Sequence, residues 1–245
     1  MAANFWASTH GTHWLLNRQQ LINSRKDDLK HINEHELTKV NIWFAKIITD
    51  LGKNLQVRQI IIATAITYFK RFYTKNSYRG TEPYLVAATC MYLACKIEES
   101  PHHIKTVISE MKKLTEGKGG FPYENQKVAE MEFYLMEELD FKMIVFHPYR
   151  ALATLAQDLG TKNEDVQNAW WVLNDTYRTD MCLLYPPHVI AAAALYLPIA
   201  LKDIREWFAL LNITDIVQEI ISLYELWTEY NEEKPQEILQ RLLKK

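Results

Sequence analysis

Apolar residues recur every three or four positions along most of this chain, which is the spacing of amphipathic helices. The stretch from Asn33 to Gly52 shows the pattern clearly. Its apolar side chains share one helical face: Val40, Phe44, Ile47, Ile48 and Leu51. Asn33 with Glu36 forms a capping-box signature at the start, and Gly52 predicts the end. Residues 12–30 predict one N-terminal helix ahead of this stretch.

Further helical patterns follow, and no stretch shows the strict alternation of a half-buried strand. They cover residues 57–73, 81–96, 100–114 and 123–141. Thr81 and Pro83 mark the entry to the second of these helices. Ser100 as N-cap and Pro101 in the first turn mark the start of the third. The sequence therefore predicts an all-α fold.

An internal repeat indicates how the helices are grouped. A shift of 104 residues places residues 83–96 over residues 187–200, with a proline at the start of both and small or apolar residues at nearly every other position. A helix that is apolar almost all round belongs at the centre of a bundle. We therefore expect two consecutive bundles joined near 146–150. The predicted divisions are an N-terminal segment and helix, a first bundle, a second bundle and a C-terminal helix, over 1–33, 34–145, 146–230 and 231–245.

The repeat also separates packing from function. Tyr92 recurs as Tyr196, which favours a packing role, whereas Lys96 lies over Ala200, so the bundle itself needs no lysine there. Lys96 is the outer end of a polar stripe that begins at Thr89. Two interpretations stay open for Lys96: a solvated end of the helix, or a contact with another chain.

A second candidate contact lies in residues 123–141. Its expected core face is spaced at 3, 4 and 4 residues: Val128, Met131, Leu135 and Leu139. Glu132 and Met136 lie about 100° round from that face, with Phe141 beyond. An acidic residue and a methionine on one exposed line indicate either a contact surface or a solvated flank.

Composition excludes several classes of function. A net charge of −2 argues against a protein that grips phosphate backbones, which needs clustered Lys and Arg. Cys90, Cys95 and Cys182 form no CxxC motif and indicate a reducing compartment. The longest apolar run, residues 189–201, is too short to span a bilayer and contains Pro198. We expect a soluble intracellular protein with no secretion signal, no membrane contact and no direct nucleic-acid contact.

Metal and catalytic motifs are weak. His31 to His35 fits the H-x-x-E-H zinc pattern, but a helix cap at Asn33 would break the single helical face that two ligands need. His102 and His103 lack a third ligand. A helical metallohydrolase would need a convergent His/Asp set that the sequence does not show. We expect no cofactor, no metal and no catalytic residues.

Several blocks of the chain resemble the cyclin family. They are "NFWASTH" (4–10), "ITYFKRFY" (66–73), "LACKIEE" (93–99), "HPYRAL" (147–152) and "NDTYRTDMCLLYPP" (174–187). The longer blocks are similar to the cyclins of the Mediator kinase module, and the resemblance covers nearly the whole chain. It implies two tandem five-helix cyclin-box bundles with an extra N-terminal helix and a short C-terminal helix.

The resemblance also implies a function. The expected protein is a nuclear, non-catalytic subunit that binds and activates a cyclin-dependent kinase of the Mediator complex and so regulates RNA polymerase II transcription. The alternative is a transcription-factor-IIB-like protein, which shares the two cyclin-type repeats but binds DNA. That class should show a basic face and usually a zinc ribbon.

Kinase-binding residues follow from the resemblance. In cyclins, a lysine and a glutamate on neighbouring helices bind main-chain groups near the kinase's αC helix; by position these are Lys96 and Glu132. The other implied kinase contacts are Ile97, Glu99, Met136, Phe141 and Met143. A ligand that binds only the active orientation of αC shifts the kinase toward that state.

Two further surfaces are implied. By resemblance, a groove between the two bundles meets another subunit of the Mediator kinase module, and its candidate residues are Trp6, Glu98, Asn174 and Asp175. Trp6 could also dock back on its own fold. The substrate-docking patch of cell-cycle cyclins is altered here, with Val57–Ile61 in place of its Met-Arg-Ala-Ile-Leu and Thr64 in place of its tryptophan. We do not expect substrates to be recruited through it.

Overall fold

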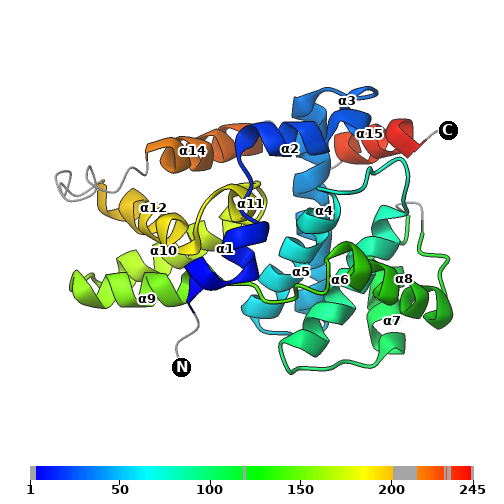
Figure 1. Ribbon diagram of the computed structural model, residues 1–245, viewed down its shortest axis with the longest axis horizontal. Helices are drawn as coiled ribbons and strands as arrows, with labels where there is room; N and C mark the ends of the chain where they lie inside the picture. Colours follow the sequence, from blue (N-terminus) through cyan, green and yellow to red (C-terminus); the bar gives the residue numbers. More distant parts are fainter. Residues whose placement is uncertain (1–3, 118–119, 201–213, 229, 231–232, 244–245) are drawn as a thin grey trace. The chain divides into compact units, whose positions relative to one another are not determined.

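Helices make up every regular element of the described chain (Figure 1). The computed structural model describes residues 4–117, 120–200, 214–228, 230 and 233–243. The all-α prediction is confirmed. The chain forms two compact units, here called the first bundle (16–145 with 231–245) and the second bundle (1–15 with 146–230).

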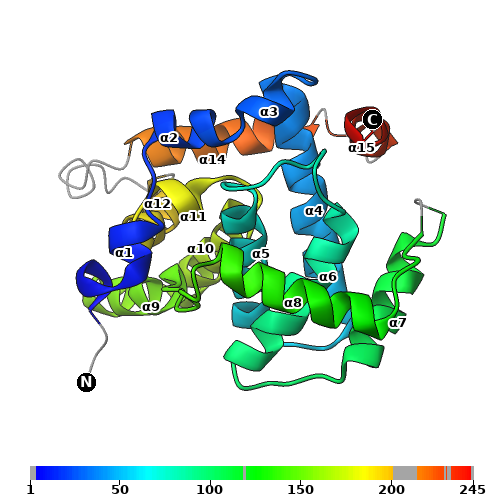
Figure 2. The same cartoon turned by 45° about the vertical axis from the view of Figure 1, so that its right-hand side comes forward.

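The first bundle is built around α6 (Pro83–Ile97), which packs against α4, α5, α7 and α8 (Figure 2). Ala87, Ala88 and Ala94 of α6 are fully buried, and their small side chains let the neighbouring helices approach closely. The other helices of this bundle are α2 (Arg18–Ser24), α3 (Lys26–Leu29), α4 (Glu34–Asn54), α5 (Gln59–Phe72), α7 (Ile104–Thr115), α8 (Asn125–Glu138) and α15 (Glu233–Leu243).

The second bundle repeats this arrangement around α12 (Pro187–Ala200), which packs against α9, α10 and α14. Ala191, Ala193 and Ala194 of α12 are fully buried, as the sequence repeat predicts. The other elements are η1 (Phe5–Ala7), α1 (Thr9–His13), α9 (Pro148–Asp158), α10 (Asn163–Thr176), α11 (Met181–Leu184) and α14 (Thr214–Thr228). Within the described ranges, no helix is both long and apolar enough to cross a membrane.

The N-terminal region differs from the prediction of one helix over 12–30. It forms three short helices, α1, α2 and α3. The chain restarts at Asn17, whose side chain accepts the Gln20 N–H while the Gln20 side chain accepts the Asn17 N–H. This capping box ends any continuous helix from α1 into α2.

Helix α4 begins as predicted but ends later. The Asn33–Glu36 capping box is present, whereas Gly52 does not stop the helix, which continues to Asn54. Gly52 is needed for packing instead. A Cβ at this position would lie 2.4 Å from Cγ1 of Ile62 and 3.1 Å from Cε of Met91.

Helix α7 also starts later than predicted. Its N-cap is His103, whose ring accepts the Lys105 N–H, and neither Ser100 nor Pro101 begins it. The Ser100 N–H instead donates to the Cys95 carbonyl and closes the end of α6. The N-cap of α7 therefore lies three positions after the predicted one.

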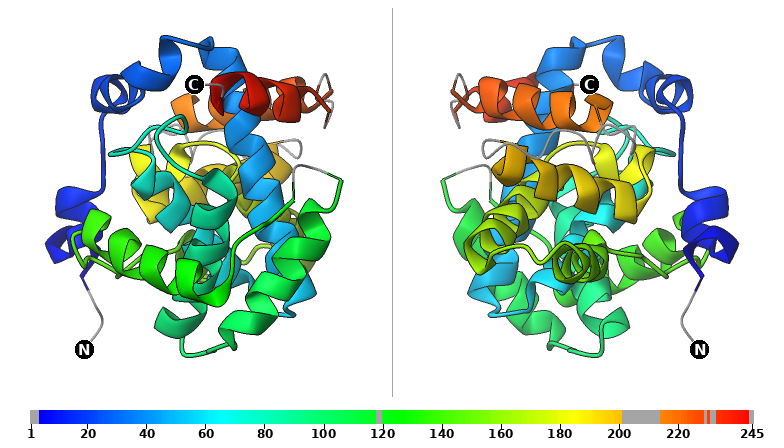
Figure 3. Two further views of the ribbon diagram at one scale, coloured as in Figure 1. Left: turned by 90° about the vertical axis from the view of Figure 1, so that its right-hand side faces the viewer. Right: turned by 90° about the vertical axis from the view of Figure 1, so that its left-hand side faces the viewer.

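The C-terminal helix α15 completes the first bundle by packing against α4 (Figure 3). Ile238, Leu239 and Leu242 are buried. Arg241 forms an ion pair with Glu36, the same residue that closes the capping box of α4. The predicted short C-terminal helix is therefore present and belongs to the first bundle.

Gly52→Ala should lower the free energy of unfolding. Overpacking a filled core costs roughly 1–3 kcal/mol, which exceeds the gain of about 1 kcal/mol from replacing glycine within a helix. Thermal and urea denaturation measure the change. The control is Lys53→Ala, one residue along on the exposed side of α4, which should be nearly neutral. A Gly52→Ala chain at least as stable as wild type would contradict the packing argument.

Candidate functional site

Lys96 and Glu132 form a two-bond ion pair within the first bundle. Lys96 lies in the last turn of α6, and Glu132 lies in the middle of the neighbouring α8. The Lys96 Nζ lies 2.7 Å from Glu132 Oε1 and 2.9 Å from Oε2. It also lies 4.6 Å from the ring centroid of Tyr92, one turn earlier on α6. The structure thus brings together the two residues that the sequence singled out.

The sequence placed Glu132 on an exposed line of its helix, and the structure shows that it is buried. Its side chain is only 9% exposed, whereas that of Lys96 is 42% exposed. The buried stripe of α8 is Val128, Glu132, Leu135 and Leu139, so Glu132 occupies the place that the sequence gave to Met131, which is only half-buried. Glu132 faces α6 because the Lys96 ammonium there neutralises its charge.

Lys96 is charged at neutral pH. Burial by itself lowers the pKa of the Lys96 ammonium, but the hydrogen bond and charge of Glu132 outweigh it, and the pKa is raised. The stability that a raised lysine pKa contributes is present below the ordinary lysine value and is lost as the pH rises through the raised value. The Lys96 ammonium is therefore charged throughout the physiological range.

Helices α6 and α8, which carry this pair, both end in left-handed turns. Glu99 has φ 52°, Asp140 has φ 52° and Phe141 has φ 54°, although none of them is glycine. The Ser100 N–H donates to the Cys95 carbonyl and the Phe141 N–H to the Met136 carbonyl, both at 2.9 Å. These are Schellman closures. Non-glycine residues in this conformation are strained, and such strain often accompanies ligand-binding sites.

Apolar side chains near the pair in sequence are unusually exposed. Ile97 is 40% exposed and Phe141 is 69% exposed, while Met136 and Met143 are half-buried. An apolar surface beside a buried ion pair is suited to contact with a protein.

Phe133 and Ile144 are exposed apolar residues that the sequence did not single out as contact residues. Their exposed fractions are 70% and 63%. Phe133 lies three residues before Met136 on α8, so helical spacing alone could have placed it on the same flank. Ile144 lies after the end of α8 in an irregular stretch, where helical spacing makes no prediction. Its exposure depends on the path of the backbone.

The four predicted groove residues lie in different units. Glu98 belongs to the first bundle, where it accepts a hydrogen bond from Thr64 Oγ1 at 2.7 Å, and its carbonyl accepts one from Arg58 at 3.1 Å. These bonds fasten the end of α6 to α5. They also engage Arg58 and Thr64 of the altered docking patch.

The other three lie in the second bundle. Asn174 accepts a hydrogen bond from Tyr149, and Asp175 accepts bonds from Arg178 and Tyr224. Both residues are on α10 and support their own bundle. Trp6 is different, because it is 61% exposed and contacts the edges of Phe5 and His188.

The candidate metal motifs have structural roles in the described chain. Asn33 caps α4 inside the H-x-x-E-H stretch, and the His31 ring contacts the Arg79 guanidinium. Among the described residues, no group of three or more His, Cys, Asp or Glu side chains converges as a metal site would require.

Comparison with known sequences places the chain in a family. The family described as Cyclin, N-terminal domain matches residues 12–144. Cyclin-C of Drosophila melanogaster is 42% identical over 247 residues, which cover 95% of this chain and 92% of that protein. The RNA polymerase II holoenzyme cyclin-like subunit of Emericella nidulans is 35% identical and covers 100% of this chain and 98% of its own length. The chain therefore belongs to the cyclin family, whose members are regulatory, kinase-binding subunits and not catalytic ones.

Solved structures share the fold. A chain of the yeast RNA Pol II CTD kinase CTDK-1 complex superimposes with a TM-score of 0.71 at 19% identity, over 86% of this chain and 72% of that one. A chain of the CAK complex from Chaetomium thermophilum gives a TM-score of 0.68 at 22% identity, over 98% of this chain and 83% of that one. The tandem arrangement of cyclin-type bundles is thus confirmed.

Lys96→Ala should destabilise the free chain, because it strands the buried Glu132 carboxylate. We expect the free energy of unfolding at pH 7 to fall by about 1–2 kcal/mol, between the value of an exposed pair and the cost of a stranded buried charge. Urea denaturation measures it. Lys105→Ala, at an exposed position of α7, is the control.

The double variant Lys96→Ala with Glu132→Gln should recover part of the loss, because no buried charge remains. A double variant less stable than Lys96→Ala alone would refute the charge-stranding explanation.

Proposed function

We propose that this chain is the regulatory subunit of a cyclin-dependent kinase that acts in RNA polymerase II transcription, and specifically of the kinase of the Mediator complex. The observation that carries the proposal is the preformed Lys96–Glu132 pair beside exposed apolar side chains of α6 and the α8 exit. The chain would bind and activate the kinase without taking part in its chemistry.

The pair has the hydrogen-bonding capacity that docking requires. An ammonium carries three N–H donors, and two of those of Lys96 are directed at Glu132. A remaining donor can bind carbonyls at the C-terminal end of a partner helix, where partial negative charge collects. The Glu132 oxygens keep lone pairs that can accept a backbone N–H. The geometry needs no rearrangement of the pair, so little ordering entropy is lost on binding.

Activation then follows from differential affinity. A kinase with its αC helix displaced lacks the Lys–Glu contact of its own active site. A subunit that binds only the active orientation shifts the population by its preference for that state, and a preference of about 5.5 kcal/mol moves it from 1:99 to 99:1. The exposed Phe141, Ile97 and Phe133 would supply apolar area for that preference.

The relatives support the transcriptional assignment. One of them is named Cyclin-C and another an RNA polymerase II holoenzyme cyclin-like subunit. Each matches this chain over nearly its whole length. We therefore propose that the protein acts in the nucleus.

A second contact is proposed for the rest of the Mediator kinase module. Trp6 carries this proposal because it is exposed while its neighbour Phe5 packs against Phe146 and His10. Phe5 thus anchors the segment and leaves the indole available. Asn174 and Asp175 of the same bundle are proposed as further residues of this contact, and Glu98 of the first bundle is proposed to contact the same module separately.

Lys96→Ala, Glu132→Ala and Phe141→Ala should each weaken capture of the kinase. Loss of one charge-assisted bond corresponds to a roughly ten- to hundredfold loss of affinity. Quantitative pulldown of the kinase from native extract measures capture, with Lys105→Ala as the matched control. Circular dichroism at the assay temperature verifies that each variant is folded. Undiminished capture by all three folded variants would refute the interface.

Trp6→Ala should spare kinase binding and reduce assembly with the larger complex, because Trp6 belongs to the second bundle and the proposed kinase contacts belong to the first. Co-purification of the kinase and of the other kinase-module subunits measures both effects in one experiment. Phe5→Leu is a useful comparison, because it weakens the packing of the segment but keeps the indole of Trp6. If Trp6→Ala lost the kinase itself, the separation of the two surfaces would be wrong.

A further inference from the structure

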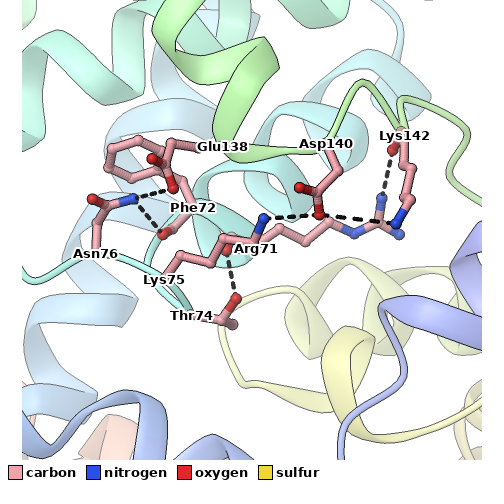
Figure 4. Close-up of polar contacts among 8 residues, drawn as sticks. All are labelled: Arg71, Phe72, Thr74, Lys75, Asn76, Glu138, Asp140 and Lys142. Atoms are coloured by element: carbon pink, nitrogen blue, oxygen red, sulfur yellow. Dashed lines mark hydrogen bonds and ion pairs between the residues drawn. The ribbon is translucent and has the colours of Figure 1, made fainter.

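The backbone that follows α8 is fastened by side chains of α5 and of the turn after it. Residues 139–145, here called the exit segment, carry Phe141 and Met143 of the proposed kinase contact and the exposed Ile144. Figure 4 shows the ends of α5 and α8 joined by hydrogen bonds and ion pairs. The bonds reach both main-chain and side-chain atoms of the exit segment.

Two of these bonds end on main-chain carbonyls. The Tyr68 hydroxyl donates to the Met143 carbonyl at 2.6 Å, and Arg71 Nη1 donates to the Lys142 carbonyl at 3.5 Å. Both donors are fully buried residues of α5. Burial raises the pKa of the Tyr68 phenol, so the hydroxyl stays protonated and remains a donor.

Two more bonds hold the last residue of α8 and the start of the exit segment. Lys75 Nζ lies 2.8 Å from Asp140 Oδ2, and Asn76 Nδ2 donates to Glu138 Oε2 at 3.0 Å (Figure 4). Lys142 adds a longer contact to Asp140 at 3.9 Å. Main-chain and side-chain anchors therefore lie on both sides of Phe141.

Phe141 itself is in an unfavourable state. It follows Asp140 in a second successive left-handed conformation, which is costly for a side chain with a Cβ, and its ring is 69% exposed. Folding alone would favour a relaxed backbone that buries the ring. Strain of this kind persists only where the surrounding structure fixes it.

We infer that Tyr68 and Arg71 are positioning residues: they fix the exit segment in the strained conformation that presents Phe141 to a partner. The inference rests on the proposed kinase interface and adds residues to it that touch no partner. If the inference holds, Tyr68 affects kinase binding only by holding Phe141 in place.

The first test uses the free chain and needs no kinase. Tyr68→Phe deletes only the hydroxyl that reaches Met143. Tyr73→Phe is the matched control, because it deletes another buried hydroxyl, bonded to Thr81 at 2.9 Å and remote from the exit segment in its bonding. Hydrogen exchange followed by mass spectrometry should show faster exchange of residues 139–145 in Tyr68→Phe alone. Equal exchange in wild type and Tyr68→Phe would overturn the inference.

The second test is a double-mutant cycle against the kinase subunit that copurifies with the wild-type chain. Tyr68→Phe should weaken binding about three- to tenfold, the usual effect of one hydrogen bond, and Tyr73→Phe should not. In a Phe141→Ala background, Tyr68→Phe should have little further effect, because the residue it positions is gone. Fully additive losses would overturn positioning through Phe141.

The two tests separate the inference from the proposed function. Faster exchange without any kinase capture by the wild-type chain would refute the kinase interface and, with it, the purpose assigned to the segment. Strong kinase capture with unchanged exchange in Tyr68→Phe would refute only the positioning role. Faster exchange together with a non-additive cycle would support both.

Discussion

The proposed kinase contact depends on one buried carboxylate. Glu132 lies in the core stripe of α8, where an uncompensated charge would cost far more than the hydrogen bonds of its neighbours return. Lys96 makes the position tolerable by reaching from the end of α6 with two hydrogen bonds. Because Lys96 remains partly exposed, the same cation that neutralises Glu132 is also open to a partner. In the proposed kinase contact, internal stability and recognition would share one interaction.

The packing of the central helices of the first bundle fixes the positions of Lys96 and Glu132. The alanines of α6 allow α5 and α8 to pack closely on either side, and the bonds of Glu98 to Thr64 and Arg58 fix the end of α6. On the other side, the bonds from Tyr68 and Arg71 fix the chain after α8. The proposed kinase contact is therefore carried by helix ends that are anchored by α5, which favours a preorganised interface.

Several features were accessible from sequence because they depend on local chemistry or on repetition. The Asn33–Glu36 capping box, the start of α6 at Pro83 and the two central alanine-rich helices are confirmed. Two of the errors arose where a residue typical of a helix end has another role in the packed structure. Gly52 resembled a helix stop but is required by the side chain of Ile62. Ser100 resembled a cap for α7 but closes α6.

The sequence by itself determined the all-helical class and the two similar bundles and singled out Lys96 as a candidate contact, because periodicity, caps and an internal repeat are properties of the linear chain. Only the tertiary structure decided that Glu132 is buried against Lys96 and that Phe133, Phe141 and Ile144 are exposed. Those facts depend on which face of α8 meets α6 and on a left-handed backbone after α8. Such choices arise from long-range packing, and no spacing rule within one helix contains that information.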